Sequence, residues 1–332
     1  MSFRICVIGC GSMSSHGHGP SFRQYANAHP ETVLAACCDL NEERAIRYRQ
    51  EFGFQRHYTD YRLMLEKEKP DAVSLVVQVQ YTAGLAVDIL RRGFPLIMEK
   101  PPGLDPAECR AIIAAAEEKK VPHQVAFNRR FTPLAQELCR ELAAVLAPEE
   151  IQYIRYDFHR VRRFDADFST TAIHAVDTVR FLTKADYINI SFTYQEIERK
   201  DGAGAPAATN FYLEAEMTTG ARAYINLCPV TGASFERATI VGQDHTFILH
   251  MPMGLDGWGR LQHIQAGKLV KDIAGNELSG TEFYQIFGFY DENAAFFADL
   301  LAGRRPQCDA AEALQSVVVA DLLRRRVQSF SA

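Results

Sequence analysis

Residues 4–14 set the architecture of the amino-terminal half and read Arg4-Ile5-Cys6-Val7-Ile8-Gly9-Cys10-Gly11-Ser12-Met13-Ser14. An apolar run of strand length is followed at once by a glycine turn with GxGxxG spacing, in which serine takes the last place. The first two glycines allow the tight turn and close backbone approach that a pyrophosphate needs, and the third lets helix and strand pack closely. The pattern predicts a strand, an anion-binding turn and a helix, with looser packing at Ser14.

A second apolar run, residues 33–38, ends at Asp39, 25 residues after Ser14. A carboxylate at this place accepts hydrogen bonds from a ribose diol and repels a 2'-phosphate, which favours NAD over NADP. The alternative is that Asp39 is the N-cap of the helix expected over residues 41–52. Strand, glycine turn, second strand and acid together favour the dinucleotide.

Apolar strands and amphipathic helices continue to alternate up to residue 127. The further expected strands are residues 72–77, 96–98 and 121–127. This alternation predicts an α/β fold, a Rossmann doubly wound parallel sheet over residues 1–128, in which ligands sit beyond the carboxyl ends of the strands.

The hydrophobic period then changes to two. Alternating runs cover residues 154–158, 188–194, 211–217 and 221–227. We therefore expect a C-terminal α+β domain over residues 129–332 with a large, mostly antiparallel sheet, and terminal helices that pack back towards the first domain. At 332 residues, two domains are the expected number.

Composition excludes several classes of partner. A formal net charge of -5 offers no basic surface for nucleic acid or anionic membrane, and no apolar run reaches the roughly 18 residues that span a bilayer. The eight cysteines lack CxxC spacing, so we expect reduced core residues in a cytoplasmic chain. His16 and His18 have no third ligand at useful spacing, and we expect no metal site.

Two segments carry residues suited to proton transfer. Lys100 follows the strand 96–98 directly, and burial at a strand end favours the neutral amine, so that Lys100 can donate or accept a proton. The alternative is a solvated Glu99–Lys100 pair. In the helix expected over residues 170–182, His174 and Asp177 are three apart and share a face, where a carboxylate can orient an imidazole. A lone histidine can equally be a satisfied core residue.

These features together resemble the Gfo/Idh/MocA family of NAD(P)-dependent oxidoreductases, which includes inositol dehydrogenases and many sugar dehydrogenases. The resemblance covers nearly the full length. It rests on the glycine turn, Glu99-Lys100-Pro101, the segment 128–131, the HxxD spacing from His174 to Asp177, and the terminal helices.

The resemblance implies that Lys100 binds the nicotinamide ribose and a substrate hydroxyl, and that His174 is the general acid/base supported by Asp177. Hydride would pass between a carbon of a sugar or cyclitol and nicotinamide C4. NAD is the first choice of cofactor, and NADP stays open. The implied cofactor-binding residues are Gly9, Gly11, Ser12, Met13, Asp39, Gln78, Glu99, Lys100 and Asn128. The expected substrate contacts are Arg129, Asp157, His159, Arg162, Thr170 and Asp177.

The chain departs from the family pattern at three places. Thr170 stands where the family often has an aspartate, residues 79–84 lack the usual proline and histidine, and Ser14 replaces the last glycine. Two other functions therefore stay open: transient redox that drives elimination, glycoside cleavage or epimerisation, and non-catalytic NAD-binding regulation. Arg162 and Arg163 could grip a carboxylated or phosphorylated substrate or form a solvated basic face.

The remaining expectations concern surfaces. One face of the second sheet carries rows of aromatic and polar side chains, such as Tyr212 and Tyr224, which suit a homodimer or homotetramer interface as well as water. Residues 199–207 are expected to form an exposed loop. Residues 252–259, which include the only tryptophan, Trp258, are expected to form either a lid or a plain surface loop.

Overall fold

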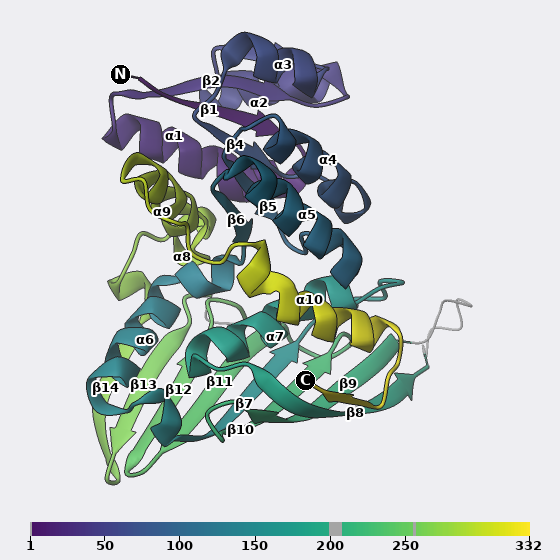
Figure 1. The fold of residues 1–332 in the computed structure, drawn as a ribbon. Helices are drawn as coiled ribbons and strands as arrows, with labels where there is room; N and C mark the ends of the chain where they lie inside the picture. The colour runs from purple at the N-terminus through teal and green to yellow at the C-terminus, as the bar shows by residue number, and fades with distance from the viewer. Residues whose placement is uncertain (1, 199–207, 255–256) are drawn as a thin grey trace. The chain divides into compact units, whose positions relative to one another are not determined.

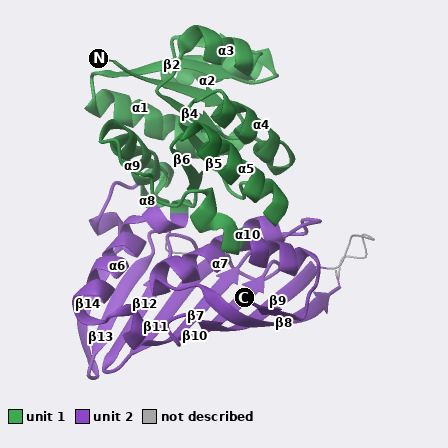
Figure 2. Cartoon of the chain, in the orientation of Figure 1, with its two compact units in different colours: residues 1–128, 282–317 green, residues 129–281, 318–332 purple. Residues whose placement is uncertain are grey.

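The structure is a computed structural model that describes residues 2–198, 208–254 and 257–332. The chain divides into two compact units (Figure 2). Unit 1 contains Met1–Asn128 and Glu282–Val317, and unit 2 contains Arg129–Thr281 and Val318–Ala332. A carboxy-terminal segment thus belongs to the unit that the amino-terminal residues build.

Unit 1 contains a six-stranded parallel sheet in the order β3-β2-β1-β4-β5-β6 (Figure 1). Its strands are β1 (Phe3–Ile8), β2 (Thr32–Cys38), β3 (Arg56–Tyr58), β4 (Ala72–Leu75), β5 (Leu96–Glu99) and β6 (His123–Ala126). The order steps outward from β1 in both directions, which is the doubly wound arrangement that the sequence predicts. The point where the order reverses lies between β1 and β4.

Helices follow the strands of unit 1 in sequence. They are η1 (Ser14–His18), α1 (Gly19–Ala28), α2 (Glu42–Phe52), α3 (Tyr61–Glu68), α4 (Val79–Arg91), α5 (Pro106–Lys119), α8 (Phe283–Ile286) and α9 (Phe289–Leu301). Helix α9 joins α1 in an aromatic core, where the ring of Phe297 packs against those of Phe3 and Tyr25. This core explains why the distant segment 282–317 folds with unit 1.

Local sequence signals set the helix ends. Asp105 caps α5 by accepting from the backbone N–H of Ala107 and Glu108, and Pro106 occupies the first helical position. The Glu108 carboxylate accepts from the N–H of Leu104, one residue before the cap. Asp105 is therefore the N-cap of α5.

Unit 2 contains a nine-stranded sheet in the order β14-β13-β12-β11-β7-β10-β9-β8-β15. Its strands are β7 (Ile151–His159), β8 (Tyr187–Ile197), β9 (Ala208–Met217), β10 (Arg222–Cys228), β11 (Phe235–Gly242), β12 (His245–His250), β13 (Arg260–Gln265), β14 (Lys268–Ala274) and β15 (Ser329–Ser331). Within this nine-stranded sheet, only the β7–β10 pair is parallel among the pairs of described strands. The mostly antiparallel sheet is confirmed.

Helices cover one face of this sheet. Unit 2 contains α6 (Pro133–Val145), α7 (Ser169–Thr183) and the short helices η2 (Asn128–Phe131, which starts in unit 1), η3 (Pro148–Glu150) and η4 (Gly275–Glu277); α10 (Ala310–Arg324) begins in unit 1 and ends in unit 2. Val176 and Val179 of α7 and Leu138 of α6 join one core with Ile154 and Tyr156 of β7. Residues on the other face of β7 alternate with these and do not enter that core.

Two expected surface loops fall partly or wholly outside the described residues. The segment 199–207 lies outside them, and so do positions 255–256 of the segment 252–259. Among the described residues, no helix combines the length and the apolar character needed to cross a bilayer.

Candidate functional site

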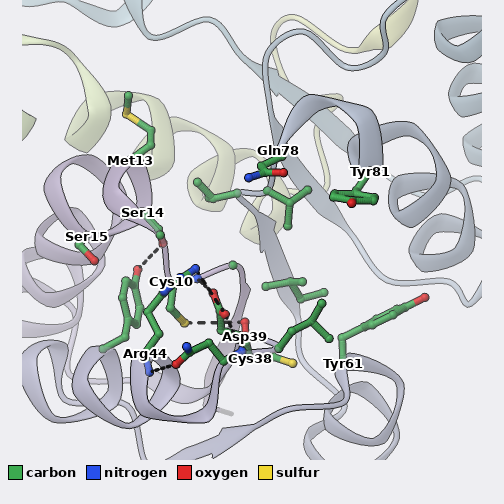
Figure 3. Close-up of a pocket in the computed structure, with 18 of the residues that line it drawn as sticks. Cys10, Met13, Ser14, Ser15, Cys38, Asp39, Arg44, Tyr61, Gln78 and Tyr81 are labelled. Carbon is green, nitrogen blue, oxygen red and sulfur yellow. Dashed lines mark hydrogen bonds and ion pairs between the residues drawn. The ribbon is translucent and has the colours of Figure 1, made fainter.

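A cavity of about 1370 Å³ opens in unit 1 where β1, β2, β3 and β4 end. Figure 3 labels side chains that follow β1, β2 and β4 around it, among them Cys10, Asp39 and Gln78. Its walls include residues 8–16 after β1, 38–41 after β2, Thr59 after β3 and 76–78 after β4. Parallel strands bring their carboxyl ends to one edge, so the cavity lies where this type of sheet binds ligands.

The glycine turn has the backbone that the sequence predicts. Gly9 has φ +96°, and a Cβ there would lie 2.0 Å from the carbonyl oxygen of Val76, so only glycine fits. A Cβ at Gly11 would have no atom of the described residues within 4 Å, and this glycine lines the cavity. The turn therefore leaves its backbone open to a ligand in the cavity.

Asp39 is tied to this turn. Its Oδ2 accepts a hydrogen bond from the backbone N–H of Cys10 at 2.9 Å, and its Oδ1 accepts from the N–H of Asn41 at 2.9 Å. The N-cap of α2 is Asn41, whose side chain accepts from the N–H of Arg44. The alternative in which Asp39 caps this helix is therefore wrong, and its carboxylate faces the cavity.

Ser14 is accommodated by a change of helix type. The residues after the turn form the π-helical turn η1, in which the N–H of Gly19 donates to the carbonyl oxygen of Ser14. The buried Ser14 hydroxyl donates to the hydroxyl of Tyr48 at 2.9 Å. Burial raises the pKa of Tyr48 well above its usual value, against the opposing effect of the Ser14 hydrogen bond. A specific polar contact thus replaces the close packing that a third glycine would give.

Large apolar side chains are exposed in this cavity. Leu40 is 94% exposed, Tyr81 58% and Met13 47%, and all three line the cavity. Solvent-exposed apolar surface gathered in a cavity indicates a ligand with flat apolar parts, such as the two rings of a dinucleotide.

Sequence reasoning identified only part of the cavity wall. Gly9, Gly11, Ser12, Met13, Asp39 and Gln78 line it as expected. The wall residues that were not predicted include Leu40, Asn41, Arg44, Arg47, Thr59, Tyr61, Arg62 and Tyr81. A usable signal existed, because most of these positions directly follow a strand end or lie in the next helical turn.

Three expected cofactor residues lie outside the described wall of this cavity, namely Glu99, Lys100 and Asn128. Glu99 is the last residue of β5, and the half-buried Lys100 follows it. Burial alone would raise the pKa of Glu99, but the hydrogen bond from His18 and the charges of His18 and Lys100 lower it. The side-chain N–H of Asn128 donates to the carbonyl oxygen of Phe287 at 2.8 Å, which ties η2 to the segment before α9.

His174 lies on α7 in unit 2, nearly buried. Its Nε2 is 3.2 Å from Nη1 of Arg129. A guanidinium only donates hydrogen bonds, so Nε2 accepts and the ring hydrogen is on Nδ1. The structure therefore brings Arg129, a predicted substrate contact, to the predicted general base.

A buried carboxylate holds Arg129. Glu236 of β11 accepts from Nη2 of Arg129 at 2.9 Å, from a guanidinium N–H of Arg160, and from the hydroxyl of Tyr156 at 2.9 Å. Burial would raise the pKa of Glu236, but the two guanidinium charges outweigh it and hold the pKa at about 2. Sequence reasoning missed Glu236, Arg160 and Tyr156 because each comes from an ordinary strand position or strand end.

Asp177 lies one turn further along α7 and is fully buried. Both of its carboxylate oxygens accept from the guanidinium of Arg130, each at 2.7 Å. This bidentate pair joins α7 to η2, which also carries Arg129. Asp177 thus anchors the segment that places Arg129 beside His174, and its support of the histidine stays a prediction.

The remaining substrate candidates separate into two groups. Thr170 lies on α7 four residues before His174, and its hydroxyl donates to the carbonyl oxygen of Asp167. Arg162 is exposed in the segment before α7, with φ +52°. Asp157 and His159 alternate with the buried Tyr156 on β7, so they lie on the opposite face of the sheet.

On that opposite face the Asp157 carboxylate binds Arg155, Arg237 and the amide of Asn226. The ring of His159 packs against Phe235, with centroids 4.3 Å apart. Side chains along a strand alternate between its two faces, so Asp157 and His159 point away from the face of β7 that forms the core. The site proposed below does not include these two residues.

Comparison with known proteins gives the family. The model for the oxidoreductase family with an NAD-binding Rossmann fold, Gfo/Idh/MocA, matches residues 3–127. Residues 3–127 thus match the NAD-binding Rossmann domain of the Gfo/Idh/MocA oxidoreductase family. All the residues that line the cavity of Figure 3 lie within the matched range.

Sugar and cyclitol dehydrogenases are among the known proteins that this chain resembles. D-apiose dehydrogenase of Paraburkholderia graminis is 33% identical over 42% of this chain and 36% of its own length. Inositol 2-dehydrogenase 2 of Saccharopolyspora erythraea is 24% identical over 77% of this chain and 75% of its own length. The chain thus aligns with about a third of the first relative and with three quarters of the second.

The fold is shared more widely. A levoglucosan dehydrogenase solved in complex with NADH has a TM-score of 0.81 and 17% identity, and the likeness covers 100% of this chain and 99% of that chain. The fold with one parallel and one mostly antiparallel sheet is therefore shared with that structure. Within the described residues, no group of three or more His, Cys, Asp or Glu side chains could hold a metal ion.

Proposed function

We propose that this chain is an NAD-dependent oxidoreductase that acts on the CH–OH group of a sugar, a cyclitol or a derivative of one, or on the matching ketone. The observation that carries the proposal is Asp39, a cavity-lining carboxylate that also fixes the glycine turn through the N–H of Cys10. The family of residues 3–127 and the sugar and inositol dehydrogenases among the relatives support it.

The residues of the cavity fit a dinucleotide. The open backbone at Gly11 and the start of the following helix suit a pyrophosphate, Asp39 suits a ribose diol, and Leu40 suits an adenine ring. NAD, when bound, accepts or returns a hydride at its nicotinamide ring. The Asp39 carboxylate favours NAD, whereas Arg44, 3.7 Å from Asp39, is a residue that could tolerate the extra phosphate of NADP.

Hydride transfer to or from an alcohol carbon requires that a proton leave or reach its oxygen. We assign this proton transfer to Lys100 of unit 1 and His174 of unit 2, each on the evidence of its own unit. Lys100 stands at the end of β5 next to an ionised Glu99, which favours the ammonium form, a proton donor. His174 presents an Nε2 lone pair, which suits a proton acceptor.

The contact with Arg129 determines the hydrogen bonding of His174 before a substrate binds. Its N–H occupies the Nε2 lone pair, and its positive charge disfavours a second proton on the ring. A substrate hydroxyl must therefore replace Arg129 at Nε2 before His174 can take the proton. The Arg129–Glu236 pair keeps the guanidinium at hand for a substrate oxygen.

The assembly and location are part of the same proposal. The outward face of the unit 2 sheet carries half-buried aromatic side chains such as Tyr153 and Tyr224, whose rings lie 5.5 Å apart. We propose that this face forms a homodimer or homotetramer interface and that the protein works in the cytoplasm. Size-exclusion chromatography with light scattering tests the first point.

The decisive experiment is a thermal-shift screen with NAD, NADP and a panel of sugars, cyclitols and their acids, followed by absorbance assays of NADH on the hits. We expect stabilisation by NAD and turnover of at least one polyol. Lys100→Met should leave NAD binding intact and lower turnover at least about a hundredfold. Conversion of a substrate without net NADH would instead favour transient redox, and NAD binding without turnover across the panel would favour a regulator.

A further inference from the structure

His18, which the mechanism above does not use, is fully buried beside the strand that ends at Lys100. It is the last residue of the π-helical turn η1, and its Nε2 lies 3.0 Å from Oε1 of Glu99, 81 residues further along the chain. A carboxylate oxygen only accepts, so Nε2 carries the hydrogen and donates it. The other oxygen, Oε2, accepts from the backbone N–H of Lys100 at 3.2 Å.

The second nitrogen of the ring is fixed as well. Nδ2 of Asn293, on α9, donates to the carbonyl oxygen of Phe289 at 2.7 Å and lies 3.1 Å from Nδ1 of His18. Oδ1 of the same amide lies 3.4 Å from Nδ1, so Asn293 contacts this ring nitrogen through both of its polar atoms. The His18 ring is therefore held from both sides, by Glu99 at Nε2 and by Asn293 at Nδ1.

Packing leaves the His18 ring little freedom. Phe289 meets it edge-on with centroids 5.3 Å apart, and Phe22 stacks on it at 6.0 Å. A Cβ at the preceding residue, Gly17, would lie 2.8 Å from the Phe289 ring. The extra residue of a π-helical turn shifts the following side chains by about 100° around the axis, which here brings His18 against Glu99.

The charge arrangement at the end of β5 is simple. Among the described residues, the titratable groups with the largest effect on the Glu99 carboxylate are His18 of η1 and Lys100, the next residue along the chain. The neighbouring strand β6 places Ala126 beside Glu99, and α9 contributes the neutral amide of Asn293. A buried, ionised carboxylate next to a lysine stabilises the ammonium form of that lysine.

We propose that His18 is a positioning residue for Lys100: its Nε2–H holds the Glu99 carboxylate, and this carboxylate keeps Lys100 in the ammonium form at the end of β5. The effect of His18 and Glu99 on Lys100 does not depend on the proposed function. Only the role of Lys100 as a proton donor in turnover rests on it. The glycine turn proposed to bind the dinucleotide continues directly into η1, which ends at His18. The His18 side chain thus connects this turn to the strand end that carries Lys100, the proposed proton donor.

The test measures the protonation of Lys100 without any turnover. Acetic anhydride acylates only neutral amines, so mass spectrometry of the Lys100 peptide across a pH series reports where Lys100 loses its proton. The exposed Lys119 is the internal reference in each sample. The variants are His18→Leu, His18→Gln and Glu99→Gln, with His29→Leu as the matched control because His29 is half-exposed at the other end of α1.

We expect the midpoint of Lys100 labelling to move to lower pH by about one unit or more in Glu99→Gln, as expected when an opposite charge is lost. His18→Leu keeps the carboxylate but removes the N–H that holds it, so the midpoint should move in the same direction by a smaller amount. His18→Gln keeps an N–H donor and should move it less. His29→Leu should match the wild type. A wild-type labelling profile in both His18→Leu and Glu99→Gln would overturn the proposal, even if these variants melted at lower temperature.

Turnover separates this inference from the proposed function. With an accepted substrate, the alkaline limb of the kcat profile of His18→Leu should move in the same direction as its labelling midpoint, with KM for NAD unchanged. A shifted labelling midpoint in a protein that turns over no alcohol would sustain the His18 assignment and sink the proposed function. Unshifted labelling in an enzyme that turns over an alcohol would overturn the His18 assignment and leave the proposed function standing.

Discussion

Replacing Glu236 by glutamine probes the charge cluster that holds Arg129 beside His174. Glu236 is fully buried and accepts hydrogen bonds from Arg129, Arg160 and Tyr156. The amide of glutamine keeps the shape but removes the negative charge, so two guanidinium groups remain without their buried counter-charge. Loss of one partner of a buried pair is strongly destabilising.

The magnitude follows from the pKa of Glu236, which lies at about 2 in the folded protein against its usual value of 4.5. The difference of about 2.5 pKa units corresponds to roughly 3 kcal/mol of folding free energy. Because the folded pKa is lowered, this stabilisation is complete above pH 4.5 and is lost as the pH falls towards 2. We therefore expect Glu236→Gln to cost roughly 3 kcal/mol at pH 7 and progressively less below pH 4.5.

Urea unfolding followed by tryptophan fluorescence reports the unfolding of unit 2, the unit that contains Glu236. Trp258 is the only tryptophan of the chain, and it belongs to unit 2 together with Glu236. Glu214→Gln, at an exposed position of β9, is the matched control and should change the free energy of unfolding by less than about 0.5 kcal/mol. A cost for Glu236→Gln below about 1 kcal/mol, or one that stays constant between pH 4.5 and 3, would refute the reasoning.

Three further predictions concern cofactor and catalysis. Asp39→Ala should weaken NAD binding tenfold to a hundredfold, about the worth of a charge-assisted hydrogen bond, and unchanged affinity by titration calorimetry would exclude Asp39 from the site. Gly9→Ala should abolish NAD binding, because its Cβ would lie 2.0 Å from the oxygen of Val76; binding at wild-type strength would contradict this. Arg129→Met should move the acidic limb of the kcat profile to higher pH, since a neighbouring positive charge no longer disfavours protonated His174; an unmoved limb speaks against the contact.

Sequence alone determined what neighbouring residues decide together. The strand, glycine turn and acid from residue 4 to Asp39 lie close in the chain, and each has a local signal in apolar period, glycine spacing or residue type. The same holds for the alternating strands of unit 2 and for the N-cap at Asp105. These signals arise from backbone geometry over a few residues, so they can be read without knowing what packs against them.

The tertiary structure decided which side chains meet. His18 and Glu99 are 81 residues apart, and Arg129 and Glu236 are 107 apart, so no local pattern pairs them. Asp177 was expected to serve His174, three residues away, yet its oxygens accept from Arg130 across 47 residues. A buried charge takes the partner that the packing of the whole unit brings within reach, because leaving it uncompensated costs several kcal/mol. The spacing of residues along the chain therefore determines the helices and strands, whereas tertiary packing determines which buried charged side chains pair.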